Sequence, residues 1–500
     1  MSVDAGSGAE PRLPDAAYFS LLGSLESGKG GTTSVLLARH RLLEPLLRER
    51  GEHLSILTFA ARPCAEHWDR LVSEGQLLPG SRVRNLYRDL AGRSRLGRQT
   101  GVLRARAPLD AVRRGPSFPL DDGMTRSSWT AADGTRGVDV LRCDGSLMVR
   151  TVQSADGEDV TLWSPEGRRL GAWHGRDAFI RWWTARQLPS GRTSVIVSDG
   201  HVVGSAIAEL GRRRDVVVVQ QLHNPHRGTA YRRLREAAAS FDRLVVLTAR
   251  QRDDLVAMDG RCARNTVVVA NPLAPSEPIP DHPPRRRHRI VVLARVHRQK
   301  GLDRAVRAFR ILADQHGARL PGLCLDVYGK VEDPGLLAAL REQAGGDDRI
   351  RFHGYRRDAR SQLASAQVMW LTSRFEGYPL ALLEAFEAGA LVAANDCEYG
   401  PAELVEDGHT GFLVRITDDD VSELVDATLR AFALPPARVE AMRSAARRAA
   451  ASGHHDPETY RRAWVDLIDR AAADHRRARP AARATVRDLL GRIRRTRHRT

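Results

Sequence analysis

The sequence predicts an α/β protein made of two doubly wound, Rossmann-like domains that face a common cleft. Short β-branched apolar runs alternate with helical patterns, which is typical of βαβ units and parallel sheets. At 500 residues the chain is too long for one compact core. A proline-dense segment, residues 272–284, interrupts the alternation, and because proline blocks both helix and sheet we expect a linker there. Ligands bind outside the carboxyl ends of such sheets, so the cleft is the expected active site.

The apolar runs place the strands and divide the chain. Before the linker the expected strands are Tyr18–Leu22, Leu54–Thr58, Val195–Ser198, Val216–Leu222, Leu244–Thr248 and Thr266–Ala270. After the linker they are Ile290–Ala294, Leu323–Tyr328, Ile350–His353, Val368–Thr372 and Leu391–Ala394. We therefore assign residues 1–90 and 188–271 to the first domain, residues 285–475 to the second, and residues 476–500 to a separate tail.

Residues 91–187 break the alternation and are interpreted as an insertion in the first domain. The turn pairs Asp144-Gly145, Asp156-Gly157 and Glu166-Gly167 recur between short β-rich pieces. Turn dipeptides about 8–12 residues apart predict an antiparallel meander, here over residues 138–173. The preceding residues 91–126 are arginine-rich and poorly periodic. Because the insertion lies outside the βα alternation, we expect it to serve assembly, such as a homo-oligomer, or contact with an acceptor, rather than the chemistry of a donor.

The high positive charge comes almost wholly from arginine. The net charge is +17, yet only three of the 78 basic residues are lysines, a skew typical of GC-rich coding. Nucleic-acid binding predicts basic residues interleaved with aromatic ones, and with aromatics at 5% we expect no nucleic-acid partner. The five cysteines are scattered, which fits a reducing cytosol better than a zinc site or disulfide framework. No apolar stretch approaches the ~18–20 residues of a membrane span, so we expect a cytoplasmic protein.

The three lysines carry information of their own. Lys29, Lys300 and Lys330 each stand next to a glycine. Where lysine has drifted to arginine elsewhere, a retained lysine indicates a position that needs a compact ammonium group rather than a forked guanidinium. The alternative at each single position is survival by chance.

A glycine-containing loop and a helix follow the strand that ends at Thr372. The segment reads Arg374-Phe375-Glu376-Gly377-Tyr378-Pro379-Leu380-Ala381-Leu382-Leu383-Glu384, and Pro379 suits the first helical position. Such a helix N-terminus offers unpaired N–H groups and a positive dipole end to a phosphate or a hydroxyl group. Glu376 lies in the loop and Glu384 over one turn into the helix, and each ionised carboxylate can accept from a pair of hydroxyls. The alternative is a capping acid with an unrelated surface acid.

A pair of cations follows the first strand of the second domain. Arg295 and Lys300 lie in Leu293-Ala294-Arg295-Val296-His297-Arg298-Gln299-Lys300-Gly301-Leu302, which opens a helix. Two cations at a strand end, beside a helix N-terminus, can neutralise a diphosphate. The alternative is a solvated basic turn, and retention of Lys300 argues against it.

These motifs together resemble family 4 glycosyltransferases, the large retaining group with the GT-B fold. That family is marked by a Glu-x7-Glu pair and an upstream Arg/Lys pair, matched here by Glu376/Glu384 and Arg295/Lys300. The stretches Glu398–Val414, Ser198-Asp199-Gly200 and Thr248–Gln251 are similar to poly(glycerol-phosphate) alpha-glucosyltransferases of wall teichoic acid synthesis, which also carry a β-rich insertion in the first domain. The resemblance is specific over residues 289–414 and looser over the first half.

The resemblance implies a role for each motif residue. The first domain would be the acceptor side and the second would bind the nucleotide sugar. Lys300 and Arg295 would hold the leaving diphosphate, Glu384 the ribose hydroxyls and Glu376 the donor sugar. The remaining donor contacts implied by position and sequence are Gly30, Gly31, Gly377, Tyr378, Pro379, Leu380 and Lys330. His223 would face the sugar from a strand end, with a loop histidine making local hydrogen bonds as the alternative.

The implied reaction moves a hexose or N-acetylhexosamine, with retention, from a UDP-type donor to an acceptor hydroxyl. A teichoic-acid-like polyol-phosphate or another cell-envelope glycan would be the acceptor. We expect no cofactor and no metal, since no Asp-x-Asp pair suited to one is present. Retention without an obvious protein nucleophile implies front-face departure of the leaving group, with cations stabilising the developing charge.

Two segments leave other interpretations open. Residues Gly23–Gly30 nearly spell a P-loop, so a P-loop-like NTPase or kinase is the alternative function, although Gly30 stands where that motif needs Ser or Thr. In the tail, Val486, Leu489, Leu490 and Ile493 fall on one helical face among arginines. That pattern predicts peripheral binding to an anionic inner membrane surface, with a docked helix or a solvated tail as the alternatives.

Overall fold

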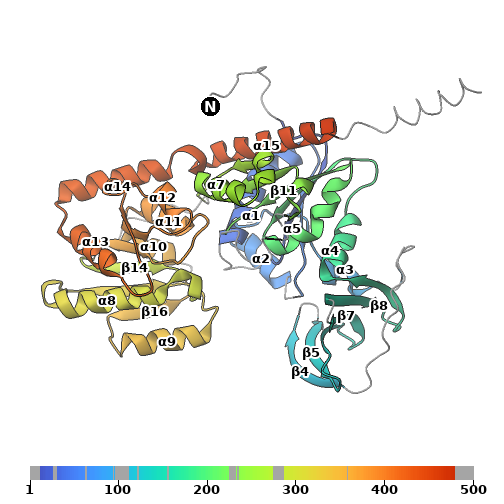
Figure 1. Cartoon of the computed structure of the whole chain (residues 1–500), viewed down its shortest axis with the longest axis horizontal. Helices are drawn as coiled ribbons and strands as arrows, with labels where there is room; N and C mark the ends of the chain where they lie inside the picture. Colours follow the sequence, from blue (N-terminus) through green and yellow to red (C-terminus); the bar gives the residue numbers. More distant parts are fainter. Residues whose placement is uncertain are drawn as a thin grey trace, which may run out of the picture.

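A computed structural model gives the arrangement of the chain. It describes residues 12–25, 31–61, 65–93, 95, 112–120, 123–154, 157–224, 232, 236–273, 286–356 and 358–478. Within these ranges the chain forms two parallel-sheet domains and one antiparallel sheet, which hangs from the first domain on the side away from the second (Figure 1).

The first domain is built on a parallel sheet in the order β13-β12-β11-β10-β1-β2-β3. Its strands are β1 (Ala17–Leu22), β2 (Leu54–Thr58), β3 (Val83–Asn85), β10 (Ser194–Asp199), β11 (Val216–Gln221), β12 (Arg243–Val246) and β13 (Thr266–Val268). Its helices are α1 (Gly31–Arg48), α2 (Ala65–Ser73), α3 (Leu86–Ala91), α4 (Arg176–Ala185), α5 (His201–Ile207) and α7 (Ala249–Met258). The central strands β10 and β11 are buried along their whole length, which is why each contains an apolar β-branched run, Val195–Val197 and Val216–Val219 respectively.

The second domain repeats this plan with the order β16-β15-β14-β17-β18-β19. Its strands are β14 (Arg289–Leu293), β15 (Cys324–Tyr328), β16 (Ile350–Gly354), β17 (Val368–Leu371), β18 (Leu391–Asn395) and β19 (Phe412–Val414). Its helices are α8 (Leu302–His316), α9 (Pro334–Ala344), α10 (Ala359–Ala364), α11 (Leu380–Ala388), α12 (Pro401–Leu404), α13 (Ser422–Ala433) and α14 (Pro436–Ala450). Each strand expected from the sequence is present, with ends that shift by one or two residues.

The insertion is an antiparallel meander, as expected, but it starts earlier than residue 138. Its strands are β4 (Val112–Pro119), β5 (Thr125–Ala131), β6 (Arg136–Leu141), β7 (Leu147–Ser154), β8 (Gly157–Trp163) and β9 (Arg169–His174). The turn glycines Gly145 and Gly167 have φ values of 81° and 75°, a region that favours glycine. In β5 the side chains of Ser127, Trp129 and Ala131 are buried in alternation. Polar residues hold some of these inward positions, so the apolar pattern is weak.

A long final helix, α15 (Pro457–Ala478), returns the chain to the first domain. It runs along the top of that domain in Figure 1. Tyr460, Trp464 and Ile468 are fully buried in a core that also contains apolar residues of β1, β10, β11 and α1. The assignment of residues 457–475 to the second domain is therefore wrong. These residues pack with the first domain, because their apolar face completes its core.

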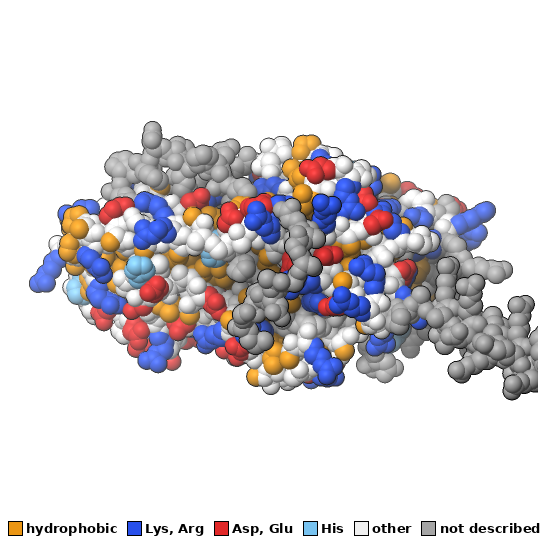
Figure 2. Space-filling view, turned by 90° about the horizontal axis from the view of Figure 1, so that it is seen from above, with side chains coloured by type: hydrophobic (Ala, Val, Ile, Leu, Met, Phe, Trp, Pro, Cys, Tyr) orange, Lys and Arg blue, Asp and Glu red, His pale blue; other side chains and the backbone are white. Residues whose placement is uncertain are grey.

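Charged side chains are mixed rather than gathered on the face that carries this helix. Figure 2 shows basic and acidic side chains interspersed there. On α15 the exposed arginines pair along the helix, as in Arg462–Glu458 and Arg470–Asp466. Although the net charge is +17, the basic side chains do not gather into a single patch on the described part of this face.

Several expected features fall outside the described residues. These are Gly30, Lys29, residues 274–284 of the linker, and residues 479–500 of the tail with its amphipathic pattern. In the described part of the chain, no helix combines the length and apolar character that a membrane crossing requires.

The packing of α15 gives a stability prediction. Replacing Trp464 by alanine removes a fully buried indole and should lower the free energy of unfolding by about 3–5 kcal/mol. Urea denaturation followed by circular dichroism measures this loss. The matched control is Arg462→Ala on the same helix, whose side chain is 68% exposed, and it should change stability by less than about 0.5 kcal/mol. Equal effects of the two changes would contradict the docking of α15.

Candidate active site between the two domains

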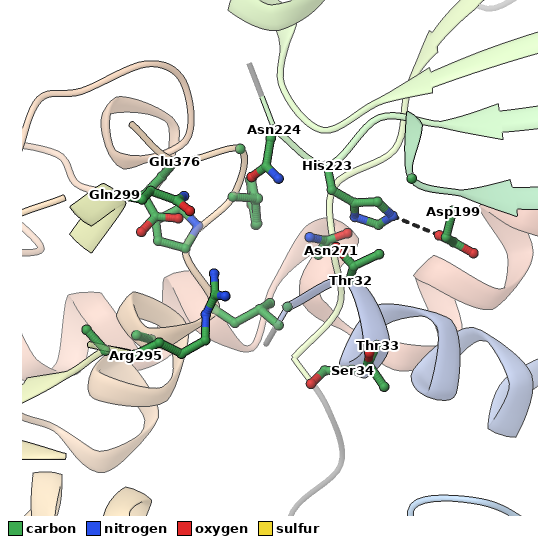
Figure 3. A pocket seen from close by; sticks show the side chains of 18 of the residues that line it. Thr32, Thr33, Ser34, Asp199, His223, Asn224, Asn271, Arg295, Gln299 and Glu376 are labelled. Carbon is green, nitrogen blue, oxygen red and sulfur yellow. Dashed lines mark hydrogen bonds and ion pairs between the residues drawn. The ribbon is translucent and has the colours of Figure 1, made fainter. Parts of the chain in front are cut away.

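A cavity of about 560 Å³ lies between the two domains at the carboxyl ends of both sheets. From the first domain it is lined by the end of β1, the start of α1, and residues that follow β10, β11 and β13. From the second domain it is lined by residues that follow β14 and β17, the start of α11, and Glu332. Figure 3 shows Arg295, Gln299 and Glu376 on one side, and His223, Asp199 and Thr32 on the other.

Most of the expected site residues meet in this cavity. The expected residues that line it are Gly31, His223, Arg295, Lys300, Glu376, Gly377, Tyr378, Pro379, Leu380 and Glu384. Lys330 is the exception among the described ones. Its backbone carbonyl accepts from Val296, and the residue is not part of the lining, so the expected donor contact of Lys330 is not supported.

Glu376 is held by two donors at one of its oxygens. The Lys300 ammonium lies 2.5 Å from Glu376 Oε1, and the Ser373 hydroxyl donates to the same oxygen at 2.7 Å. Glu376 is buried, with only 5% of the residue exposed. Among the described residues no group donates to Oε2, which is therefore available to accept from a ligand hydroxyl.

The other cation of the motif is also paired. Arg295 donates to Glu332 at 2.6 Å, and both side chains are partly exposed in the cavity. Arg295 and Lys300 thus each rest against a carboxylate of their own domain. Glu332 lies outside the sequence motif, in the loop before α9.

Helix α11 opens on the cavity. Pro379 is its N-cap residue and not its first helical residue, because its ψ of 97° is extended. No side chain caps this end, so first-turn N–H groups are available to an anion. Helix α1 begins at Gly31 on the opposite wall, so two helix N-termini face one cavity. Burial raises the pKa of Glu384, against the opposing effect of Arg360.

One glycine brings the two domains into contact. The backbone carbonyl oxygen of His223 would lie 1.7 Å from a Cβ atom added to Gly377. Only a residue without a side chain fits there, which explains why the loop after β17 needs glycine at this position. The contact places the expected sugar-facing histidine directly against the expected donor loop.

His223 is oriented by a carboxylate. Its Nε2 lies 2.8 Å from Asp199 Oδ1, and this contact leaves Nδ1 for a ligand in the cavity. Asp199 also pairs with Arg39 of α1, and both side chains are fully buried. Burial alone would raise the pKa of Asp199, but the charges of Arg39 and His223 hold it below its usual value.

The arginine behind this pair is covered by the returning helix. Arg39 donates to Gln221 at 2.6 Å as well as to Asp199, and its guanidinium carbon lies 4.6 Å from the centre of the Trp464 ring. A stacked, fully buried arginine is stabilised by the ring as well as by its carboxylate. The sequence analysis missed Arg39, because one arginine among many carries no local signal.

Several other lining residues were also missed. They are Thr32, Thr33, Ser34, Asp199, Asn224, Asn271, Gln299 and Glu332. Their position was the available signal, because most follow a strand at its carboxyl end or begin a helix. Asp199 stood within a quoted motif but received no role.

Comparison with known proteins finds similarity over part of the chain. Residues 287–433, within the second domain, match the family described as "Glycosyl transferases group 1". An exopolysaccharide phosphotransferase of Streptomyces coelicolor is 31% identical over 241 residues, covering 48% of this chain and 25% of that protein. A poly(glycerol-phosphate) alpha-glucosyltransferase of Bacillus subtilis is 25% identical over 200 residues, covering 39% of this chain and 29% of that protein. The chain thus spans little more than a quarter of these relatives.

Solved structures match over nearly the whole chain. A point mutant of TarM from S. aureus, solved with fondaparinux, alpha-GlcNAc-glycerol and UDP, has a TM-score of 0.67 at 14% identity, covering 91% of this chain and 99% of that one. The chain has the GT-B fold. The pneumococcal O-GlcNAc transferase GtfA, solved with UDP and GlcNAc, has a TM-score of 0.61 at 15% identity, covering 91% and 99%. At these identities the structures establish the GT-B architecture alone.

The alternative of a P-loop NTPase gains no support from these matches. Residues 26–30 of its candidate loop, Lys29 included, lie outside the described part of the chain. In the described residues, His, Cys, Asp and Glu side chains form no group suited to a metal ion. The expectation that no metal takes part stays a prediction.

The contact at Gly377 gives a structural prediction. In Gly377→Ala the new methyl group meets the His223 carbonyl, so the domains of this GT-B protein should separate and its radius of gyration in small-angle scattering should increase. Gly335→Ala is the matched control in the same domain, since an added Cβ there comes no closer than 3.4 Å to its neighbours. An unchanged scattering curve for Gly377→Ala would show that the loop alone absorbs the clash.

Proposed function

We propose that this protein is a retaining, metal-independent glycosyltransferase that moves a hexose or N-acetylhexosamine from a nucleotide-diphosphate sugar, UDP-linked, to an acceptor hydroxyl. The observation that carries the proposal is the convergence of two cations, two helix N-termini and the glutamates Glu376 and Glu384 on one interdomain cavity. The matched family segment and the GT-B fold support it. The UDP and sugars named for TarM and GtfA support the donor class.

The leaving diphosphate binds between the cations and the start of α11. Arg295 and Lys300 supply two positive charges, and unpaired N–H groups of the first helical turn supply donors. These groups stabilise the negative charge that develops as the glycosidic bond breaks, which is where preorganised donors lower a barrier most. The same charge can otherwise be supplied by a metal ion, so the cation pair removes the need for one.

The sugar and the ribose bind to the two glutamates. Oε2 of Glu376 accepts from sugar hydroxyls while Oε1 stays bonded to Lys300, so one residue orients both the sugar and the cation. Glu384 accepts from the ribose hydroxyls. His223, held through Nε2 by Asp199, presents Nδ1 to a further sugar hydroxyl. These contacts fix the donor so that the anomeric carbon faces the first domain.

Retention follows from departure and attack on the same face of the sugar. The acceptor hydroxyl approaches from the first domain, and its proton passes to the leaving phosphate oxygen as the new bond forms. No protein nucleophile takes part. The acceptor is a teichoic-acid-like polyol-phosphate or another cell-envelope glycan, a class suggested by the names of the relatives.

Substitution of Lys300 tests the proposal. Lys300→Ala should lower kcat for sugar transfer, or for slow hydrolysis of the donor, by about 10²-fold or more, because it removes a charge that acts mainly in the transition state. Lys300→Arg should also be impaired, since the Nζ atom lies 2.5 Å from a buried glutamate and a guanidinium is larger.

Two variants control this experiment. Arg298→Ala removes an exposed cation from the same short turn, outside the cavity lining, and should keep near-normal turnover. Lys330→Arg makes the same exchange at a lysine outside the lining. If the kcat of Lys300→Arg equals that of the wild type, the site does not require a lysine at this position. If no UDP-, GDP- or ADP-sugar is turned over, the proposed function is wrong.

Metal removal gives a second test. Donor turnover should persist in excess EDTA, because Arg295 and Lys300 provide the charge that Mg²⁺ or Mn²⁺ would supply. The measurement is the rate of nucleotide release with and without chelator, with an established metal-dependent transferase treated in parallel. Complete loss that only a divalent cation restores would contradict the metal-free mechanism.

A further inference from the structure

A second cavity, of about 550 Å³, lies where the insertion meets the first domain. The insertion contributes the inner faces of β4 to β8, with valines on β6 and β8. The first domain contributes the loop after β2, Tyr87 of α3 and the start of α4. None of the residues to which we give a role in sugar transfer lines this cavity, so its polar and aromatic lining indicates a separate role.

The wall between the two cavities is a single strand-end loop. The Phe59 amide, directly after β2, donates to the carbonyl of Gly23 at 3.0 Å, and Gly23 lines the interdomain cavity. The Phe59 carbonyl accepts from Arg176 at 3.3 Å, and Arg176 lines the second cavity together with Ala60. The two cavities are therefore neighbours on the same edge of the first sheet.

The second cavity offers hydrogen-bond donors. Tyr87 is only 8% exposed, and burial raises the pKa of its phenol, so the hydroxyl stays protonated. In the described part of the chain no hydrogen bond engages that hydroxyl, and no ion pair engages Arg126 on β5. The Tyr87 hydroxyl and the exposed Arg126 side chain therefore both offer donors to a ligand in the cavity.

The charge and shape of the lining indicate the ligand. Arg126 and Arg176 face one carboxylate, Glu158, which leaves an excess of one positive charge. Phe118 lies opposite Arg126 in the β4–β5 register and is 53% exposed, unusual for a large apolar ring. An aromatic rim beside arginines and hydroxyls suits a chain that carries both apolar faces of sugars or polyols and negative charges.

We propose that this cavity binds a distal part of an anionic acceptor chain, with phosphodiester-linked, hydroxyl-bearing units, while the reacting hydroxyl of the same chain lies in the interdomain cavity. The inference rests on the proposed function, because it extends the acceptor site of that reaction. A chain long enough to reach both cavities gains the second contact intramolecularly and binds more tightly than a short one. The insertion would thus make the enzyme prefer long acceptor chains to short ones.

The test compares a glycerol-phosphate dimer with a long glycerol-phosphate oligomer as acceptors. Tyr87→Phe removes only the hydroxyl, and Arg126→Ala removes an exposed charge, so both variants should fold. Each should raise KM for the long oligomer about tenfold, as expected for a lost hydrogen bond to a charged group, and leave kcat and the KM of the dimer unchanged. Arg136→Ala is the control, an exposed arginine on β6 outside the cavity lining.

Calorimetry with the long oligomer separates this inference from the proposed function. Weaker binding of the long oligomer by both variants supports an acceptor site in the second cavity even if no sugar is transferred. Arg136→Ala should bind the oligomer normally, and binding of uncharged dextran should not change in any variant. If both variants transfer sugar normally and bind the long oligomer normally, the second cavity is not an acceptor site, and the proposed function still stands. A change in sedimentation coefficient of Tyr87→Phe or Arg126→Ala, with oligomer binding unchanged, identifies a subunit interface and also overturns it.

Discussion

The buried carboxylate of Asp199 is the constraint on which the first domain depends. A charge without water needs partners, and this one has Arg39 and His223. Breaking a buried pair of this kind typically costs about 3–5 kcal/mol. Arg39 in turn lies under Trp464, so one carboxylate ties together the first helix, two central strands and the last described helix. The same charge orients the cavity histidine and holds the arginine that α15, docked through its apolar face, covers.

In the second domain the paired charges are less deeply buried than Asp199 and Arg39. Lys300 and Arg295 each rest against a carboxylate, Glu376 and Glu332 respectively, so the cations are positioned before any ligand arrives. A preorganised site loses less conformational freedom on binding than one that must assemble. The contact of Gly377 with the His223 backbone joins this half of the site to the half that Asp199 organises.

The sequence predicted features that are local in the chain. Apolar β-branched runs such as those in β10 and β11 showed the parallel sheets, and strand-end motifs located the cations and glutamates of the cavity. Features that depend on distant partners were not predictable in this way. Residues 457–475 were assigned to the second domain, because the sheet that α15 covers is distant from it in the chain. Arg39 could not be told from other arginines, and β5 was hidden because serine and threonine occupy much of its length.

Because α15 returns to the first domain, the polypeptide crosses between the domains twice. The two crossings touch, since the Leu273 amide donates to the carbonyl of His455 at 3.3 Å. The first domain is therefore not one contiguous stretch of the sequence, whereas the second, from β14 to α14, is. A chimaera that joins residues 1–273 to the second domain of another GT-B protein would lack α15, so the apolar residues of the first domain that pack against Trp464 would be exposed to water. A chimaera that preserves the core of the first domain must therefore take residues 457–478 from the same protein as residues 1–273.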